Sequence, residues 1–202
     1  MGDELRGENL VHLNVRFSTE TELKKIQEFL YEKSGQGVSF TGLVEAMANE
    51  VTIVTAVHNI KSNKGSKTAG VDKIKMDKYL QMPKDELILL IQSCFRNYRP
   101  KPARREYIEK SNGKKRPLGI PTVLDRIIQE CVRIIIEPIC EARFYPQSYG
   151  FRPYRAQKHA IRGIINVINA GCKSPDQPVW AIEGDIKGCF DNINHRLLLQ
   201  KL

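Results

Sequence analysis

The sequence predicts an α+β fold that is rich in helices, with one antiparallel β-ribbon and the first strand of a further sheet. Three observations support this class. Apolar residues recur at helical spacing through much of the chain. Asn112-Gly113 separates two stretches of alternating polar and apolar residues, which is the strongest short signal for a hairpin. The apolar run VWAIEGD at 179–185 is typical of a buried strand.

The composition is that of a globular chain with a real core. Its 202 residues are 41% hydrophobic and 27% charged, enough for one domain or two small lobes. No apolar run approaches the ~20 residues of a membrane span, and the N-terminal MGDELRGENL lacks the residue order of a secretory signal. The five cysteines are scattered without a CxxC pair. This favours reduced thiols in a cytosol-like compartment and argues against a disulfide scaffold and a zinc ribbon.

Three packing helices are expected in the first half of the chain. Thr19 and Glu22 have the spacing of a capping box at the start of the first helix, which ends near Gly35. The second helix is expected over about 43–59 and the third over 84–98, since both segments place apolar residues on one helical face.

The segment 60–79 interrupts this helical pattern. It carries six lysines, two aspartates and two glycines, which predicts a mobile, positively charged loop that leads into a short element. Such lysines often line only a solvated surface, but their excess over the aspartates favours contact with backbone phosphates.

The positive charge of the chain is concentrated. The net charge is +9, and residues 95–120 hold nine basic and two acidic side chains, with Phe95, Tyr98 and Tyr107 among them. That combination is expected of a site for a polyanion. On charge alone, a solvated basic face is an equal alternative. Residues 1–50 are acidic, with nine acidic and five basic side chains, so direct contact with nucleic acid is less expected there.

The predicted ribbon pairs 104–110 with 115–121. Pro117 suits an edge strand, because proline has no N–H for a neighbouring strand. A basic ribbon can close over phosphates, and its tip and rim carry six cationic residues: Arg104, Arg105, Lys110, Lys114, Lys115 and Arg116.

The second half of the chain alternates helices with functional loops. A helix with a wide apolar face is expected over 122–143 and another over 156–170. Between them, 144–155 is rich in aromatic residues, prolines and arginines. It suits a structural corner or stacking on bases. A turn is expected at 174–178, and Asn194 is expected to cap the last helix.

Asp185 ends the predicted strand, and a carboxylate there can reach into an active cleft. Magnesium prefers oxygen ligands, and two such ions can clamp the oxygens of phosphoryl transfer. Asp185 fits one ligand, with the Ile186 carbonyl as a second donor. An aspartate that only caps the following turn is at least as common, and Asp191 is expected to stabilise that turn.

The order of these features resembles a known family. GKKRPLGIPTVLDRIIQE (113–130), FYPQSYGFRPYRAQKHAI (144–161) and GDIKGCFDNINH (184–195) resemble, in this order, the group II intron-encoded reverse transcriptases, or maturases. The lysine-bearing stretch that ends in TAGVD (68–72) is similar to the N-terminal extension of their fingers. The likeness covers roughly 40–202.

This resemblance implies the fingers and upper palm of a reverse transcriptase. The chain is then expected to divide into four segments: an N-terminal helical segment at 1–38, the fingers extension with its lysine-rich loop at 39–100, the fingers at 101–177 and the start of an incomplete palm at 178–202.

The resemblance also implies roles for individual residues. Asp185 would be the first catalytic carboxylate and would bind both Mg²⁺ ions. Phe190 would lie beneath the sugar of the incoming nucleotide, where its ring would exclude a 2′-hydroxyl. The triphosphate would be held by Arg104, Lys110 and Arg116. Template RNA would be contacted by Lys61, Lys64, Lys67, Lys114, Lys115, Tyr149, Gly150, Phe151 and Arg152.

The family implies an RNA-directed DNA polymerase that also assists intron splicing. Expected partners are group II intron RNA, template RNA with a DNA primer, and deoxynucleoside triphosphates, in a bacterial cytoplasm or an organelle and without a membrane. No Tyr-x-Asp-Asp sequence occurs in these 202 residues. The chain is therefore expected to be an N-terminal fragment that binds RNA without polymerising, and a homodimer is a candidate assembly. A splicing maturase without catalysis and a reverse transcriptase of another retroelement are the alternatives.

Overall fold

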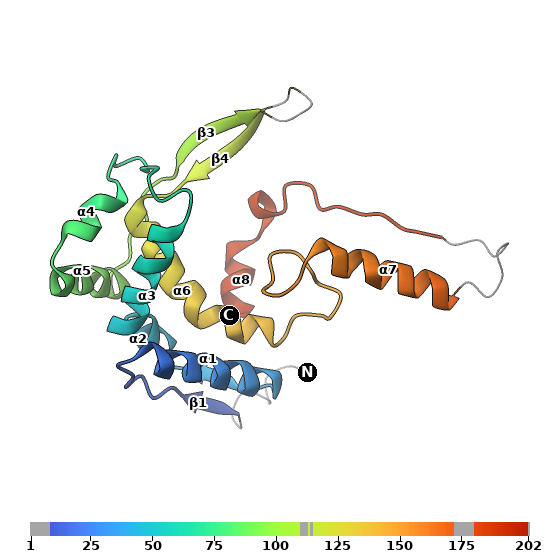
Figure 1. The fold of residues 1–202 in the computed structure, drawn as a ribbon, viewed down its shortest axis with the longest axis horizontal. Helices are drawn as coiled ribbons and strands as arrows, with labels where there is room; N and C mark the ends of the chain where they lie inside the picture. The colour runs from blue at the N-terminus through green and yellow to red at the C-terminus, as the bar shows by residue number, and fades with distance from the viewer. Residues whose placement is uncertain (1–8, 110–112, 114, 172–179, 202) are drawn as a thin grey trace. The chain divides into compact units, whose positions relative to one another are not determined.

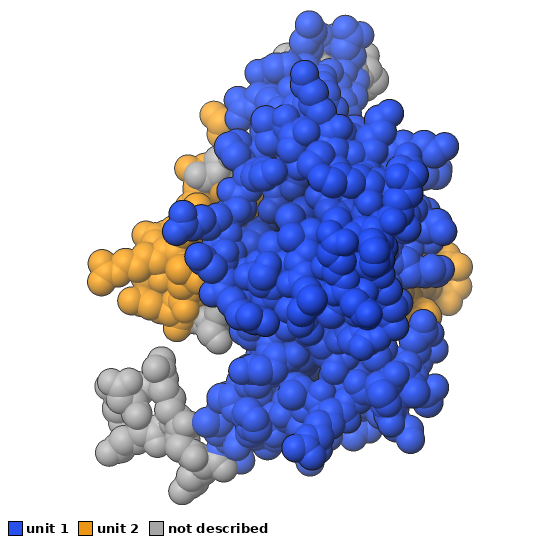
Figure 2. Space-filling view, turned by 90° about the vertical axis from the view of Figure 1, so that its left-hand side faces the viewer, with its two compact units in different colours: residues 1–145 blue, residues 146–202 orange. Residues whose placement is uncertain are grey.

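The computed structural model describes residues 9–109, 113, 115–171 and 180–201. The chain forms two compact units, residues 1–145 and residues 146–202, which Figure 2 colours separately. Helices dominate and two small sheets accompany them (Figure 1), so the predicted α+β class is confirmed.

The first unit holds most of the secondary structure. Its helices are α1 (Glu20–Gly35), α2 (Leu43–Met47), α3 (Glu50–Ser62), α4 (Met76–Gln81), α5 (Lys84–Arg96) and α6 (Val123–Glu141). Its strands are β1 (Leu10–His12) and β2 (Ser39–Thr41), which pair in parallel, and β3 (Arg104–Glu109) and β4 (Lys115–Ile120), which pair antiparallel.

Helix α6 is the centre of this unit. Its apolar face is buried against α1, α2, α3 and α5. Apolar residues at helical spacing line that face, and six of them are almost fully buried: Val123, Ile127, Ile128, Cys131, Ile134 and Ile135. Burial of each such valine or isoleucine side chain stabilises the fold by about 1.5–3 kcal/mol relative to exposure.

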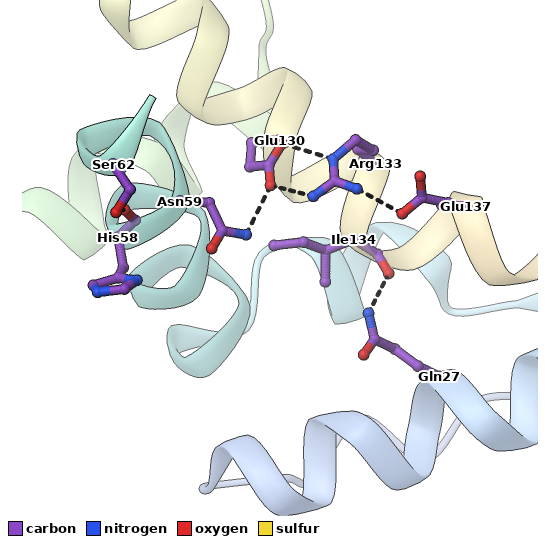
Figure 3. A network of polar contacts seen from close by, with 8 residues as sticks. All are labelled: Gln27, His58, Asn59, Ser62, Glu130, Arg133, Ile134 and Glu137. Atoms are coloured by element: carbon purple, nitrogen blue, oxygen red, sulfur yellow. Dashed lines mark hydrogen bonds and ion pairs between the residues drawn. The ribbon is translucent and has the colours of Figure 1, made fainter. Parts of the chain in front are cut away.

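A proline inside α6 is compensated by a side chain of α1. Pro138 has no N–H, so the carbonyl of Ile134, four residues earlier, loses its helical donor. Gln27 of α1 donates its side-chain amide to that carbonyl at 2.9 Å (Figure 3). A half-buried carbonyl that the helix ladder leaves unpaired is thus satisfied across the helix interface.

Further polar bonds join the end of α1 to the end of α6. The Ser34 hydroxyl donates to the Ile139 carbonyl at 2.8 Å. Arg143 donates through Nε to Ser34 Oγ and through Nη2 to the Val38 carbonyl, both at 2.9 Å. The Ser34 bond satisfies a carbonyl of the last turn of α6, where helix carbonyls lack partners within the helix.

The start of α1 is as predicted, whereas the second predicted helix is wrong. Thr19 and Glu22 form the capping box. The segment expected to be one helix over 43–59 is divided into α2 and α3 at Asn49. The Asn49 side chain accepts from Val51 N at 2.8 Å and donates to the carbonyls of Val15 and Phe17. An N-cap that also holds the N-terminal segment is favoured here over a continuous helix.

The basic ribbon is confirmed. Glu109 pairs with Lys115, and Tyr107 pairs with Pro117, in the antiparallel register. Pro117 therefore lies in a two-stranded ribbon, where each strand has a free edge that tolerates proline.

The second unit contains α7 (Gln157–Gly171), a short 3-10 helix (Phe190–Asn192) and α8 (His195–Lys201). Asn194 caps α8, as predicted, by accepting from Leu197 N at 3.1 Å. No side chain of α7 is buried. Among the described residues, no helix is both long enough and apolar enough to cross a membrane.

The buried strand predicted at 179–185 is wrong for the residues that the structure describes. Residues 180–186 form no strand and are exposed, with Trp180 89% accessible. A strand requires a hydrogen-bonding neighbour, and the strands of the described ranges pair only as β1 with β2 and β3 with β4. The apolar run alone cannot form a sheet.

Candidate nucleic-acid interface

The lysine loop, residues 63–75, is attached to the core, whereas the sequence predicts a mobile segment. Its backbone forms successive turns, with bonds from Ser66 N to Asn63 O at 2.9 Å and from Thr68 N to Gly65 O at 3.0 Å. Arg126 of α6 donates through Nη1 to the Gly65 carbonyl at 2.8 Å and through Nη2 to the Thr68 carbonyl. The exposed lysine side chains therefore project from a backbone with a defined path.

A glycine allows this loop to approach α6 closely. A Cβ added to Gly70 would lie 2.6 Å from Thr122 Cα and 2.9 Å from the Pro121 carbonyl oxygen. Both contacts are with backbone, which cannot move aside as a flexible side chain can. Only glycine fits where the loop meets the start of α6.

The first turn of α6 also holds the segment that leads into the ribbon. The buried carboxylate of Asp125 accepts from the Thr122 hydroxyl at 2.6 Å and from the Tyr98 hydroxyl at 3.0 Å. Burial and the hydrogen bond to Asp125 raise the pKa of Tyr98 to about 12. Lys101 forms an ion pair with Asp72 of the lysine loop at 3.5 Å. The lysine loop and the approach to the ribbon are thus fastened to the same helix end.

Arg104 and Arg116, predicted to hold the triphosphate, lie on one face of the ribbon. Residues directly opposite each other on paired strands share a face, and residues two apart on one strand do so too. Arg116 pairs with Ile108, which is four residues beyond Arg104. Arg104 donates to Glu106 at 2.9 Å, whereas Arg116 is exposed.

The remaining predicted lysines of this unit divide between exposed positions and positions that the structure leaves out. Lys61, at the end of α3, is exposed, as are Lys64 and Lys67 in the lysine loop and Lys115 on β4. Lys110 and Lys114 lie outside the described residues.

The loop SYGFRPYR (148–155) of the second unit is held by hydrogen bonds from its own arginines. Arg152 is buried and donates to the Ser148 carbonyl at 2.8 Å. Arg155 donates to the Pro146 carbonyl at 2.6 Å, and its guanidinium lies 5.6 Å from the centre of the Tyr149 ring. Arg152, predicted to contact the template, therefore holds the loop in this structure.

The same loop presents two aromatic rings to solvent. Phe151 and Tyr154 have positive φ values of 57° and 59°, which bulky residues rarely adopt. Both rings are fully exposed, and Gly150 is exposed beside them. Backbone conformations of this kind concentrate at binding sites, so the exposed rings suit stacking on bases.

Asp185 and Phe190 lie on an exposed stretch of the second unit. Asp185 and Ile186 precede a turn over 187–189, and Phe190, 87% accessible, opens the 3-10 helix. Asn192 donates to the Gly188 carbonyl at 2.9 Å and so stabilises the turn. The sequence assigns that role to Asp191, whose side chain lies outside the described residues; Asn192 was missed.

A metal centre would need further ligands. In the part of the chain that the structure describes, no three His, Cys, Asp or Glu side chains gather where they could hold one metal ion. Asp185 offers one carboxylate, and magnesium is commonly held by one or two carboxylates together with substrate phosphates. Asp185 therefore fits as one donor of such a site.

Comparison with known proteins shows which family this chain is similar to. Residues 108–202 match the family described as reverse transcriptase (RNA-dependent DNA polymerase). The chain is also 42% identical over 162 residues to the group II intron-encoded protein LtrA of Lactococcus lactis, a match that covers 79% of this chain. The chain belongs to the group II intron reverse transcriptases. The matched region begins in β3 and includes Asp185 and Phe190.

Matches to other relatives also cover only part of each protein's length. It is 43% identical over 147 residues to Protein YkfC of Escherichia coli, covering 69% of this chain and 36% of that protein. It is 29% identical over 147 residues to nuclear intron maturase 1 of Arabidopsis thaliana mitochondria. The chain spans about a third of Protein YkfC and a quarter of LtrA.

Proposed function

We propose that this chain is the part of a group II intron reverse transcriptase that binds RNA and the incoming nucleotide. The protein that carries it would copy RNA into DNA and assist the splicing of its own intron. The observation that carries this proposal is the family match over residues 108–202. The exposed lysines at the end of α3 and in the lysine loop, and the exposed rings of the SYGFRPYR loop, support it from physical chemistry.

Within this proposal, residues 39–177 would form the fingers with their extension, and residues 178–202 would begin a palm. Arg104 and Arg116 on their shared ribbon face would contact the triphosphate, since a guanidinium can pair with a phosphate through two parallel hydrogen bonds. Lys61, Lys64, Lys67 and Lys115 would contact RNA backbone, and Phe151 would stack on a base.

Asp185 would hold Mg²⁺ with the Ile186 carbonyl and the phosphates of the substrate. The ion would supply charge stabilisation for phosphoryl transfer. The residues of this chain would orient the nucleotide: the arginines fix its phosphates, and the ring of Phe190 excludes a 2′-hydroxyl from the sugar position. The selected substrates would be deoxynucleoside triphosphates.

Primer extension on an RNA template tests the catalytic assignment in the protein that carries this chain. Asp185→Ala should abolish DNA synthesis and leave binding to intron RNA nearly unchanged. Glu183→Ala is the matched control, because Glu183 is an exposed carboxylate on the same extended stretch, and its loss should leave synthesis intact. DNA synthesis by the Asp185 variant would overturn the assignment.

The choice of sugar is tested separately with Phe190→Ala. The variant should incorporate ribonucleotides, because removal of the exposed ring makes room for a 2′-hydroxyl. Unchanged selectivity between ribonucleotides and deoxynucleotides would exclude Phe190 as a steric gate.

The 202-residue chain alone should bind RNA without synthesising DNA, since its sequence contains no Tyr-x-Asp-Asp acids. Affinity for RNA should fall steeply with salt, because each lysine–phosphate contact releases counterions. Binding that does not respond to salt would contradict contact through these lysines. Splicing activity without any DNA synthesis by the protein that carries the chain would favour the alternative of a maturase without catalysis.

A further inference from the structure

The guanidinium of Arg126 donates hydrogen bonds to the protein backbone. Its two terminal nitrogens donate to the carbonyls of Gly65 and Thr68, which lie 61 and 58 residues away in the sequence. Burial lowers the pKa of Arg126, and the nearby Asp72 partly counters this effect. A half-buried guanidinium that grips two carbonyls is poorly placed to contact phosphate itself.

The two carbonyls flank the positions of the exposed lysines. Gly65 follows Lys64, and Thr68 follows Lys67. The planar fork of Arg126 therefore fixes the backbone directly after each lysine. Lysine has a single ammonium at the end of a flexible stem and cannot reproduce this paired geometry.

Other contacts fasten the lysine loop to the same helix end. Gly70 packs against the Thr122 backbone, and Asp72 pairs with Lys101 in the segment that precedes the ribbon. Tyr98 of that segment donates to Asp125, the neighbour of Arg126. The first turn of α6 is thus a common support for two basic segments that are separate in sequence.

We propose that Arg126 is a positioning residue that holds the lysine loop in the conformation in which Lys64 and Lys67 contact RNA phosphates. This proposal rests on the proposed RNA-binding function. Without Arg126, the loop would lose two backbone anchors, and RNA would have to order it on binding at the expense of conformational entropy.

A double-mutant cycle tests the coupling between Arg126 and the two lysines. Binding of the full 202-residue chain to a fluorescein-labelled single-stranded RNA of mixed sequence is measured by anisotropy at one low salt concentration. Four proteins are compared: the unchanged chain, Arg126→Lys, the pair Lys64→Gln and Lys67→Gln, and the combination. Arg126→Lys keeps the charge and removes the paired geometry.

Arg126→Lys should weaken binding about fivefold, since several loop residues must then be ordered by RNA. The lysine pair should matter clearly less in the Arg126→Lys background than in the unchanged chain, because residues that act together are not additive. Arg133→Lys is the matched control: Arg133 is a half-exposed arginine of the same helix that pairs with Glu130 and Glu137 and not with the loop. Its effects should add to those of the lysine pair.

Hydrogen exchange without RNA supplies an independent measurement. The amides of Ser66 and Thr68, bonded within the loop turns, should exchange faster in Arg126→Lys and in Arg126→Gln, while amides in the middle of α6 keep their protection. Unchanged loop exchange in both variants would overturn the anchoring. Full additivity with the lysine pair would overturn the positioning role alone. Faster exchange together with no effect of the lysine pair on RNA affinity would overturn the RNA role of this loop, and with it the proposed function at this site.

Discussion

Single residues decide how the two basic segments meet α6. Asp125 is buried with two hydroxyl donors, Thr122 and Tyr98, and Tyr98 is the one that comes from outside the helix turn. Buried carboxylates need such donors, because burial without a partner disfavours the charged form. The Tyr98 hydroxyl therefore links the stability of this turn to pH.

Tyr98→Phe should lower the free energy of unfolding at pH 7 by about 1 kcal/mol, the usual value of one hydrogen bond. The pKa of Tyr98 is raised from 10.0 to about 12 in the folded chain, so the protonated form favours folding. That contribution is complete below pH 10 and is lost as pH rises through 12. Urea unfolding at pH 8 and at pH 11.5 should show the difference between the two proteins shrink; a constant difference would contradict the pKa assignment.

Gly70→Ala should destabilise the chain by about 1–3 kcal/mol, as overpacking does. The added methyl group would lie 2.6 Å from Thr122 Cα. Gly35→Ala is its control, because a Cβ at the last residue of α1 meets nothing within 4 Å. It should be neutral or stabilise by about 0.5 kcal/mol, since alanine is favoured over glycine in helices. Thermal unfolding measures both variants, and equal effects would contradict the close approach at Gly70.

At the scale of elements, α1 supplies a hydrogen-bond donor that α6 lacks. Pro138 removes a donor from α6, and Gln27 of α1 replaces it. Glu130 and Arg133 extend the polar contacts of α6 to Asn59 of α3 (Figure 3). Burial alone would raise the pKa of Glu130, but hydrogen bonds from Arg133 and Asn59 outweigh burial and lower the pKa. Helix packing in this unit thus depends on polar partners as well as on the apolar core.

Gln27→Met should lower the free energy of unfolding by about 1–2 kcal/mol, because it leaves the Ile134 carbonyl without its donor. In a Pro138→Ala background the same change should matter much less, since residue 138 then has an N–H that can bond to Ile134. Urea unfolding of the four proteins gives the coupling. Equal losses in both backgrounds would show that the carbonyl finds another partner.

The sequence predicted those elements whose signals are local. The capping box of Thr19 and Glu22 and the Asn-Gly ribbon depend on residues a few positions apart, and both are confirmed. Asn49 divides a predicted helix because it bonds to Val15 and Phe17, more than thirty residues away. Arg126 was missed as an anchor for the same reason, since its partners come from a loop about sixty residues earlier. For the candidate site, residue types suggested the chemistry, but only tertiary contacts show which arginines hold loops.

At the scale of the whole molecule, the two units differ in how their apolar residues are used. The buried hydrophobic core extends from Leu13 to Ile135, within the first unit. In the second unit, α7 and α8 expose a series of aliphatic side chains: Ile161, Ile164, Ile165, Val167, Leu197, Leu198 and Leu199. Extended apolar surface of this kind marks contact sites or promotes association.

Residues 1–145 alone should fold with nearly the same melting temperature as the 202-residue chain, because they contain its described core. Sedimentation velocity should show association of the 202-residue chain that increases with concentration and is absent from residues 1–145. Association of residues 1–145 to the same extent would assign the contact to the first unit. Failure of residues 1–145 to fold would show that the second unit contributes to the core.

The bonds between α1 and α6 also determine when the first unit can form during synthesis. The hydrogen-bond partners of Gln27 and Ser34 lie 107 and 105 residues further along the chain. At a translation rate of roughly 5–20 residues per second, α1 leaves the ribosome about 5–20 s before the helix that covers it. Its apolar side chains, Leu23 and Leu30 among them, lack the cover of α6 during that interval. Until α6 emerges, the nascent α1 therefore exposes apolar surface of the kind that favours aggregation.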